Sequence, residues 1–142
     1  MDPPEMGTWY LSTTRPDGRP HAAGVGGAWH DGDVYFTAGA GTRKARNLAH
    51  NPACVLSISL KGIDVVLEGH AERLEDPALV KEVIEQEFAP GWPAEVKGAQ
   101  IVGPYNAPSA GPPPWDLYRF TFDTVFAVAT KEPNGATRWR FG

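Results

Sequence analysis

The stretch TWYLSTTRPDGRPHAAGVGGAWHDGDVYFT, residues 8–37, decides the fold. Its apolar and β-branched runs are separated by Asp-Gly pairs at 17–18 and 31–32, and Asp-Gly suits the positive φ of tight hairpin turns. The pattern predicts an antiparallel meander of three strands. These strands are expected at 8–14, 19–29 and 34–37. The glycine-rich segment 24–27 marks either a bulge or barrel bend, or a place where a flat ligand lies against bare backbone.

The rest of the chain adds strands and two helices. A short helix is expected over Thr42–His50, because Thr42 is a good N-cap and Pro52 prevents continuation. A longer helix is expected over Pro77–Phe88, with apolar residues at helical spacing and Asp76 as its cap. Further strands are expected at 54–60, 63–74, 115–122, 125–130 and 137–141. The fold class is therefore mainly β: a small barrel of six or seven mostly antiparallel strands with appended helices.

Glycine and proline are abundant, with 16 and 14 of the 142 residues. Much of this excess falls in residues 89–114, where we expect one long loop without regular structure. A loop of this length usually serves a function or packs on a partner, so it is expected to determine substrate choice. With 42% hydrophobic residues, the chain suits a single domain over 1–142.

The charge and the cysteine and histidine content argue against several kinds of partner and site. The net charge is -4, so there is no overall basic field and no nucleic-acid partner is expected. Cys54 lies in an apolar run and is expected to be a buried hydrophobic residue. The four histidines are scattered, and without paired ligands no metal site is expected. No signal peptide or membrane span is recognisable, so we expect a cytoplasmic protein that has no membrane partner.

The segment GAGTRKARN, residues 39–47, has the clearest chemical signal. Three basic residues follow its glycines: Arg43, Lys44 and Arg46. They lie at the start of the predicted helix, where the helix dipole disfavours positive charge. Free N–H groups there, together with Thr42 and Asn47, predict a phosphate or carboxylate site. The alternative is a solvated basic helix face.

Several motifs of the chain occur together in one known superfamily. They are WYLST at 9–13, DGRPH at 17–21, DGDVYF at 31–36, KARNL at 44–48, NP at 51–52 and TRWRF at 137–141. In this order they resemble the pyridoxamine 5′-phosphate oxidase-like split-barrel flavoproteins over nearly the whole chain. Residues 44–48 and the C-terminal motif are most similar to the actinobacterial flavin/deazaflavin oxidoreductases, which use FMN or F-420. True pyridoxamine phosphate oxidases are longer and carry substrate-phosphate motifs that this sequence lacks.

The resemblance implies a split β-barrel homodimer with each cofactor in a groove between the subunits. It implies that the phosphate is held by Thr42, Arg43, Lys44 and Asn47. It also implies that the ring and ribityl chain are flanked by Tyr35, Phe36, Thr37, Val25, Gly26, Gly27 and Ala28. Beside the long loop, the candidates for a substrate pocket are Trp92, Tyr105 and Trp115. No catalytic side chain is assigned.

Together these observations predict an oxidoreductase that transfers a hydride between F-420 and an unsaturated or quinone-like small organic substrate. One alternative is an FMN-dependent reductase or oxidase of the same fold. Another is a non-catalytic protein that binds F-420 or haem, in which His21, His50 or His70 would ligate iron. A third is a binder of nucleic acid or a phosphorylated ligand through the basic segment 43–46.

Overall fold

The structure is a computed structural model that describes residues 8–88, 94–104, 107, 110–130 and 135–141. The strands are β1 (Trp9–Thr14), β2 (Pro20–Val25), β3 (Gly27–His30), β4 (Asp33–Gly39), β5 (Ala53–Leu60), β6 (Ile63–Arg73), β7 (Glu95–Lys97), β8 (Gln100–Val102), β9 (Trp115–Ala129) and β10 (Ala136–Arg140). The helices are α1 (Arg43–His50) and α2 (Pro77–Val83), and α2 continues into a π-helical turn, η1 (Ile84–Phe88).

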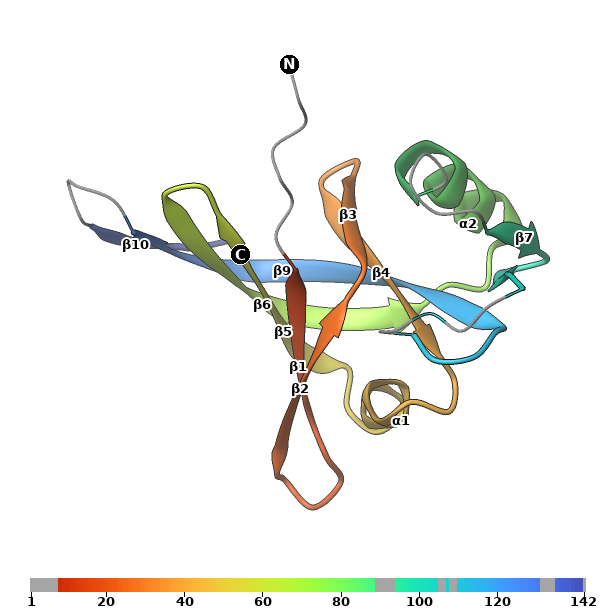
Figure 1. The fold of residues 1–142 in the computed structure, drawn as a ribbon. Coiled ribbons are helices and arrows are strands. Elements are labelled where there is room, and N and C mark those ends of the chain that lie inside the picture. Colours follow the sequence, from red (N-terminus) through yellow and green to blue (C-terminus); the bar gives the residue numbers. More distant parts are fainter. Residues whose placement is uncertain (1–7, 89–93, 105–106, 108–109, 131–134, 142) are drawn as a thin grey trace.

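The strands form one antiparallel sheet in the order β2-β1-β5-β6-β9-β4-β3. In addition, β10 pairs with β9, and β8 pairs with both β7 and β9. The two ends of this order, β2 and β3, are consecutive in the chain and are separated only by Gly26. The sheet must therefore curl so that its two edges approach each other (Figure 1). This arrangement confirms the predicted mainly-β split barrel.

Both predicted hairpin turns are confirmed. Gly18 has a φ of +90° in the β1–β2 turn, where the Asp17 carboxylate accepts a hydrogen bond of 3.0 Å from the Arg19 backbone N–H. In the β3–β4 turn, Asp31 and Gly32 have φ values of 47° and 87°. Segment 19–29, however, is two strands on opposite edges of the sheet. The meander prediction was wrong here, because the break at Gly26 separates the two pairings.

Both helix caps are also confirmed. The Asp76 carboxylate accepts a hydrogen bond of 3.0 Å from the Ala78 N–H at the start of α2, and Thr42 caps α1. The helix predicted over Pro77–Phe88 has these bounds, although its last five residues are π-helical. No helix in the described part of the chain has the length and apolar character needed to cross a bilayer.

Strand β9 differs from the two strands predicted at 115–122 and 125–130. It runs without a break for 15 residues, from Trp115 to Ala129. The polar pair at 123–124 does not end it, because β9 accommodates Asp123 as an extra residue at a bulge: Glu68 of β6 pairs with Thr124, and the next residue, Gly69, pairs with Phe122. A single continuous strand can therefore pair with β4, β6, β8 and β10.

The loop predicted over 89–114 contains regular structure, so that expectation was wrong. Strands β7 and β8 form a hairpin whose turn includes Gly98, with a φ of +61°. Ile101 in β8 is fully buried and lies opposite Trp115 of β9. This apolar contact ties the hairpin to the sheet and explains why a Pro- and Gly-rich segment still forms strands. With these additions the described residues form ten strands rather than six or seven.

Two hydrophobic cores lie on the two sides of the sheet near β4 and β9. The first is formed mainly by Trp9, Leu11, Phe36, Leu56, Leu67 and Phe120. The second lies beneath α2 and η1 and includes Tyr35, Val80, Ile84, Ile101, Trp115 and Leu117. Cys54 belongs to the first core, as predicted, and burial raises the pKa of its thiol to about 12. Cys54 is therefore a packing residue at neutral pH.

Candidate functional site

Three residues separate the end of β4 from the start of α1, and the last of them, Thr42, determines where the helix starts. The Thr42 hydroxyl donates a hydrogen bond of 2.8 Å to the Gly39 carbonyl and accepts one of 3.3 Å from the Ala45 N–H. Its only hydroxyl hydrogen is thus used within the chain. Thr42 therefore determines where the helix starts. As at any helix N-terminus, the first backbone N–H groups of α1 have no carbonyl partner within the helix.

The two glycines before Thr42 have different surroundings. A Cβ on Gly39 would lie 2.5 Å from the Ala110 carbonyl oxygen, which accepts a hydrogen bond of 2.9 Å from the Gly39 N–H. A Cβ on Gly41 would have nothing within 4 Å. Gly39 is therefore required by the protein's own loop, whereas Gly41 leaves open space beside the start of α1.

Polar side chains lie on the buried side of α1. Asn47 is fully buried and donates a hydrogen bond of 3.0 Å from Nδ2 to Thr13 Oγ1, while its Oδ1 has no partner among the described residues. Lys44 is also buried, and burial lowers the pKa of its ammonium group. Across the β1–β2 pair, Thr13 lies opposite His21, whose buried Nδ1 has no partner in the described part of the chain. We call Thr13, His21, Lys44 and Asn47 the α1 polar cluster.

Positive charge converges on the α1 polar cluster. The pKa of His21 is lowered, first by burial and then by the charges of Arg15, Lys44 and Arg43. Neither Arg15 nor Arg43 forms an ion pair with a carboxylate in the described residues. Several positive charges close together attract a bound anion. The cluster therefore fits a phosphate or carboxylate group.

The residues predicted to flank a ring lie at the end of β2 and on the paired strands β3 and β4. The β3–β4 register places Gly27 opposite Phe36 and Ala28 opposite Tyr35. Phe36, Tyr35 and Thr37 are buried in the cores, so their side chains do not form an exposed surface. A flat ligand would meet the backbone of this segment instead.

The glycine-rich segment 24–27 serves two purposes. A Cβ on Gly27 would lie 2.9 Å from the Trp9 ring, so the close approach at this position is made by the protein itself. A Cβ on Gly26 would have nothing within 4 Å. Of the two interpretations of these glycines, packing accounts for Gly27, and an open backbone surface remains at Gly26 beside Val25.

Of the three candidates for a substrate pocket, Trp115 is the one that lies within the described residues. Trp115 is fully buried in the second core, where its indole N–H donates a hydrogen bond of 2.8 Å to the Gly111 carbonyl. It therefore supports the fold from inside and does not line a surface pocket, which corrects the prediction. Trp92 and Tyr105 lie outside the described residues.

Sequence reasoning missed three members of the site. Thr13, Arg15 and His21 belong to the β1–β2 hairpin, and the anion-site prediction used only the segment after β4. Counting outward from the Asp17-Gly18 turn gives the Thr13–His21 pairing. Nothing in the sequence, however, indicates that this hairpin packs against α1.

Two hollows lie near α1, but neither includes Lys44. One, of about 410 Å³, is lined by residues of α1, β6 and β9 that include Arg46, Arg73, Glu72 and Asp116. The other, of about 450 Å³, is lined by residues of β1, β5 and β6 that include Thr13, Cys54 and Gly69. The first carries charges of both signs. Thr13, a member of the α1 polar cluster, lines the second hollow, which therefore lies next to the cluster.

A curled antiparallel sheet with a basic helix after a central strand defines a split β-barrel domain of the flavin-binding type. The sequence matches the family described as pyridoxamine 5′-phosphate oxidase over residues 4–129. The chain belongs to this family.

Solved structures with the same fold include three informative ones. PhzG from Burkholderia lata 383, in complex with tetrahydrophenazine-1-carboxylic acid, is 17% identical with a TM-score of 0.67, covering 96% of this chain and 77% of PhzG. A pyridoxamine 5′-phosphate oxidase-related, FMN-binding protein from Nostoc punctiforme is 14% identical, with a TM-score of 0.64 and coverages of 95% and 86%. An F420 reductase is 22% identical, with a TM-score of 0.57 and coverages of 84% and 88%. No curated protein matches the sequence.

Proposed function

We propose that this protein is a cytoplasmic, homodimeric oxidoreductase that binds F-420 and transfers a hydride between it and an unsaturated or quinone-like small organic molecule. The observation that carries the proposal is that the charges of Arg15, Lys44 and Arg43 act together on His21, whose buried Nδ1 has no partner in the described residues. The F420 reductase of the same fold supports the choice of F-420. FMN is the alternative cofactor, supported by the FMN-binding protein of the same fold.

The residues present fit a cofactor phosphate. Lys44 is desolvated, and a charge in such surroundings interacts more strongly with an anion than an exposed lysine does. Arg43 and the first backbone N–H groups of α1 supply further donors. The amide of Asn47 has one group without a partner in the described residues. That group is Oδ1, an acceptor, so Asn47 would donate to a phosphate with its amide turned, so that Thr13 Oγ1 donates to Oδ1 and Nδ2 faces the ligand.

The bound deazaflavin would supply the redox chemistry. This chain's contribution is positioning. The α1 polar cluster holds the phosphate, and the open backbone at Gly26 lies at the junction of β2 and β3. The adjacent side chains of β4 are packed in the cores, so this surface is rigid. No acid or base is required of the protein for hydride transfer itself.

The cofactor assignment is tested by titrating the purified chain with F-420, FMN and haem in parallel, using fluorescence for the first two and the Soret band for haem. We expect F-420 to bind most tightly, and reduced F-420 to be reoxidised when an enone is added. Tighter binding of FMN would replace F-420 in the proposal. Binding of haem alone would contradict an oxidoreductase of this type.

The proposed dimer would cover an apolar face of the sheet. Cross-strand partners point to the same side, and the pairings Tyr10–Ser57, Ser57–Val66 and Val66–Phe126 run across four strands. On this face Tyr10 and Phe126 are 53% and 38% exposed, and Val128 is also exposed. Exposed apolar residues that gather on one face favour a protein partner. We propose a second copy of this chain as that partner.

Replacing Phe126 by lysine is expected to convert the dimer to monomer, because a charge would be buried without a partner in the apolar contact. Sedimentation velocity measures this change, and F-420 affinity is expected to fall with it. Gln86→Lys is the matched control, since it adds the same charge on exposed η1. A monomeric parent protein with full cofactor affinity would contradict the shared groove.

A further inference from the structure

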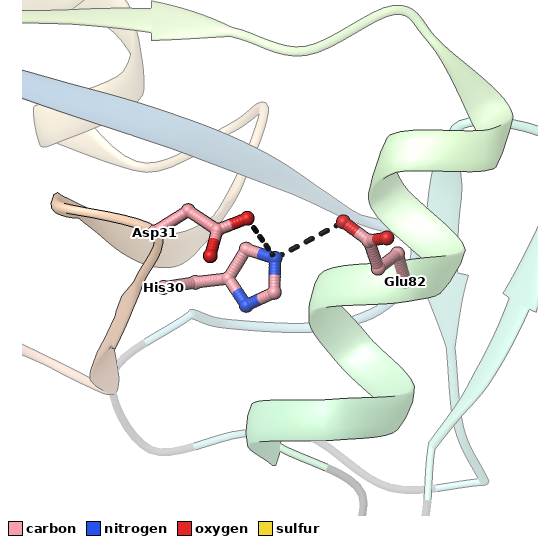
Figure 2. A group of neighbouring side chains, drawn as sticks. All are labelled: His30, Asp31 and Glu82. Atoms are coloured by element: carbon pink, nitrogen blue, oxygen red, sulfur yellow. Dashed lines mark hydrogen bonds and ion pairs between the residues drawn. The ribbon is translucent and has the colours of Figure 1, made fainter.

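A second cluster of ionisable side chains surrounds His30 at the end of β3. The His30 side chain is only 6% exposed. Its Nδ1 lies 3.1 Å from Glu87 Oε1, and its Nε2 lies 3.0 Å from Glu82 Oε2 and 3.5 Å from Asp31 Oδ2. Figure 2 shows Asp31 from the hairpin and Glu82 from the helix directed at the same ring nitrogen. We call these four residues the His30 cluster.

The local backbone explains why these groups meet. Asp31 follows His30 in the β3–β4 turn, where its φ of 47° directs the chain back. Glu82 lies in α2 and Glu87 in η1. They are five residues apart, the same spacing that a hydrogen bond spans in a π-helix. The widened turn lets both glutamates reach the same imidazole, one at each nitrogen. Such π-helical turns occur frequently at functional sites.

The arrangement requires a cation near Nε2. A neutral imidazole has one N–H and one lone pair, yet both ring nitrogens of His30 face carboxylate oxygens. A proton on Nδ1, donated to Glu87, leaves the Nε2 lone pair directed at two carboxylates. That contact is repulsive unless a second proton or a metal ion lies between them.

We propose that the His30 cluster is a binding site for a divalent transition metal such as Zn²⁺, with His30 Nε2 and the carboxylates of Asp31 and Glu82 as ligands. The three ligand atoms lie within 4.8 Å of one another. Zinc bonds of about 2.0–2.2 Å in tetrahedral geometry separate the ligand atoms by roughly 3.4 Å, close to the separations from Nε2 in this structure. Small side-chain movements therefore suffice, and the exposure of Asp31 gives the ion access.

Glu87 completes the site as the outer partner of the histidine. Metal-bound histidines usually donate their second N–H to a carboxylate, which fixes the tautomer and orients the ring. The 3.1 Å contact between Nδ1 and Glu87 fits that role. The bound metal would fasten the β3–β4 hairpin to α2 and η1. His30 lies at the opposite end of β3 from Gly27, so this inference does not depend on the proposed cofactor.

The sequence did not indicate this metal site, because the residues that form it lie far apart in the chain. Glu82 is 52 residues from His30, and Glu87 is 57 residues away. Only the packing of α2 and η1 against β3 brings them together. The predicted absence of a metal site relied on paired histidines or cysteines, which this site does not use.

The test is calorimetric titration of the metal-free full chain, without an affinity tag, with Zn²⁺. We expect one ion per chain. Glu82→Gln should weaken binding at least tenfold, and Glu87→Gln by about 10- to 100-fold although it does not touch the metal. Glu85→Gln is the matched control, because it removes the same charge from η1 outside the cluster. Circular dichroism of each variant verifies that it is folded.

The position of the ion is read from the histidine ring nitrogens by ¹H–¹⁵N NMR. We expect Zn²⁺ to shift Nε2 of His30 and to leave His21, His50 and His70 unchanged. The proposal is overturned if Zn²⁺ perturbs only those other histidines, or if the Glu82, Glu87 and Glu85 variants all bind it as the parent does. It is equally overturned if the parent binds no Zn²⁺, in which case the His30 cluster is held by a proton alone.

Discussion

Replacing Lys44 by methionine is expected to weaken F-420 binding by about 10- to 100-fold, the effect of losing one charge-assisted hydrogen bond. Methionine keeps most of the volume of the buried side chain and removes its charge. Because burial lowers the pKa of Lys44, the charged form is held at a free-energy cost in the unliganded protein. Urea unfolding of the variant verifies that it is folded, so that a loss of affinity can be assigned to the missing charge.

The measurement combines fluorescence titration with urea unfolding of the same variant. Arg46→Gln is the control, since it removes a positive charge from an exposed position of α1 that lines the neighbouring hollow. We expect it to leave the dissociation constant within about threefold. If FMN is the cofactor, the same difference should appear with FMN. An unchanged affinity in Lys44→Met, or a larger loss of affinity in Arg46→Gln, would contradict the proposal that the α1 polar cluster binds the phosphate.

Replacing Gly69 by alanine is expected to lower the free energy of unfolding by about 3 kcal/mol or more. Gly69 lies at the bulge where β6 crosses β9. A Cβ there would be 2.0 Å from the Thr121 carbonyl oxygen and 2.7 Å from the Phe122 Cα. Both are backbone atoms of the central strand, so relief requires the strands to separate.

Urea unfolding of Gly69→Ala and the parent protein measures this loss. Gly135→Ala is the control, because a Cβ at that position has nothing within 4 Å. It should change stability by no more than about 1 kcal/mol, in the stabilising direction. An unchanged midpoint for Gly69→Ala would mean that the bulge adapts to a side chain, contrary to the close packing described above.

Several features of the site were predictable because they depend on neighbouring residues. Thr42 caps α1 through atoms three residues away on either side. Arg43 and Lys44 come directly after Thr42 in the sequence, so the segment 39–47 was enough to predict that they lie at the start of a helix. The buried state of Lys44 was not readable, because it results from the packing of α1 on β1 and β2.

The position of Trp115 could not be predicted from the sequence. Trp115 stands next to a proline-rich segment, which indicated a surface position. Instead, Ile101 of the β7–β8 hairpin packs opposite it, and Trp115 is enclosed. Sequence pattern alone does not distinguish an aromatic residue that lines a pocket from one that closes a core, since both have apolar neighbours in the chain.

The sequence by itself determined the hairpin turns at Asp17-Gly18 and Asp31-Gly32, the caps at Thr42 and Asp76, and the basic start of α1. These features rest on contacts within a few residues. Only the tertiary structure decided that the chain splits at Gly26 between the two sheet edges, that His21 lies beside Lys44, and that Glu82 and Glu87 enclose His30. These contacts join residues more than 20 positions apart. They depend on how the whole sheet curls, which is a property of its combined packing and not of any one segment.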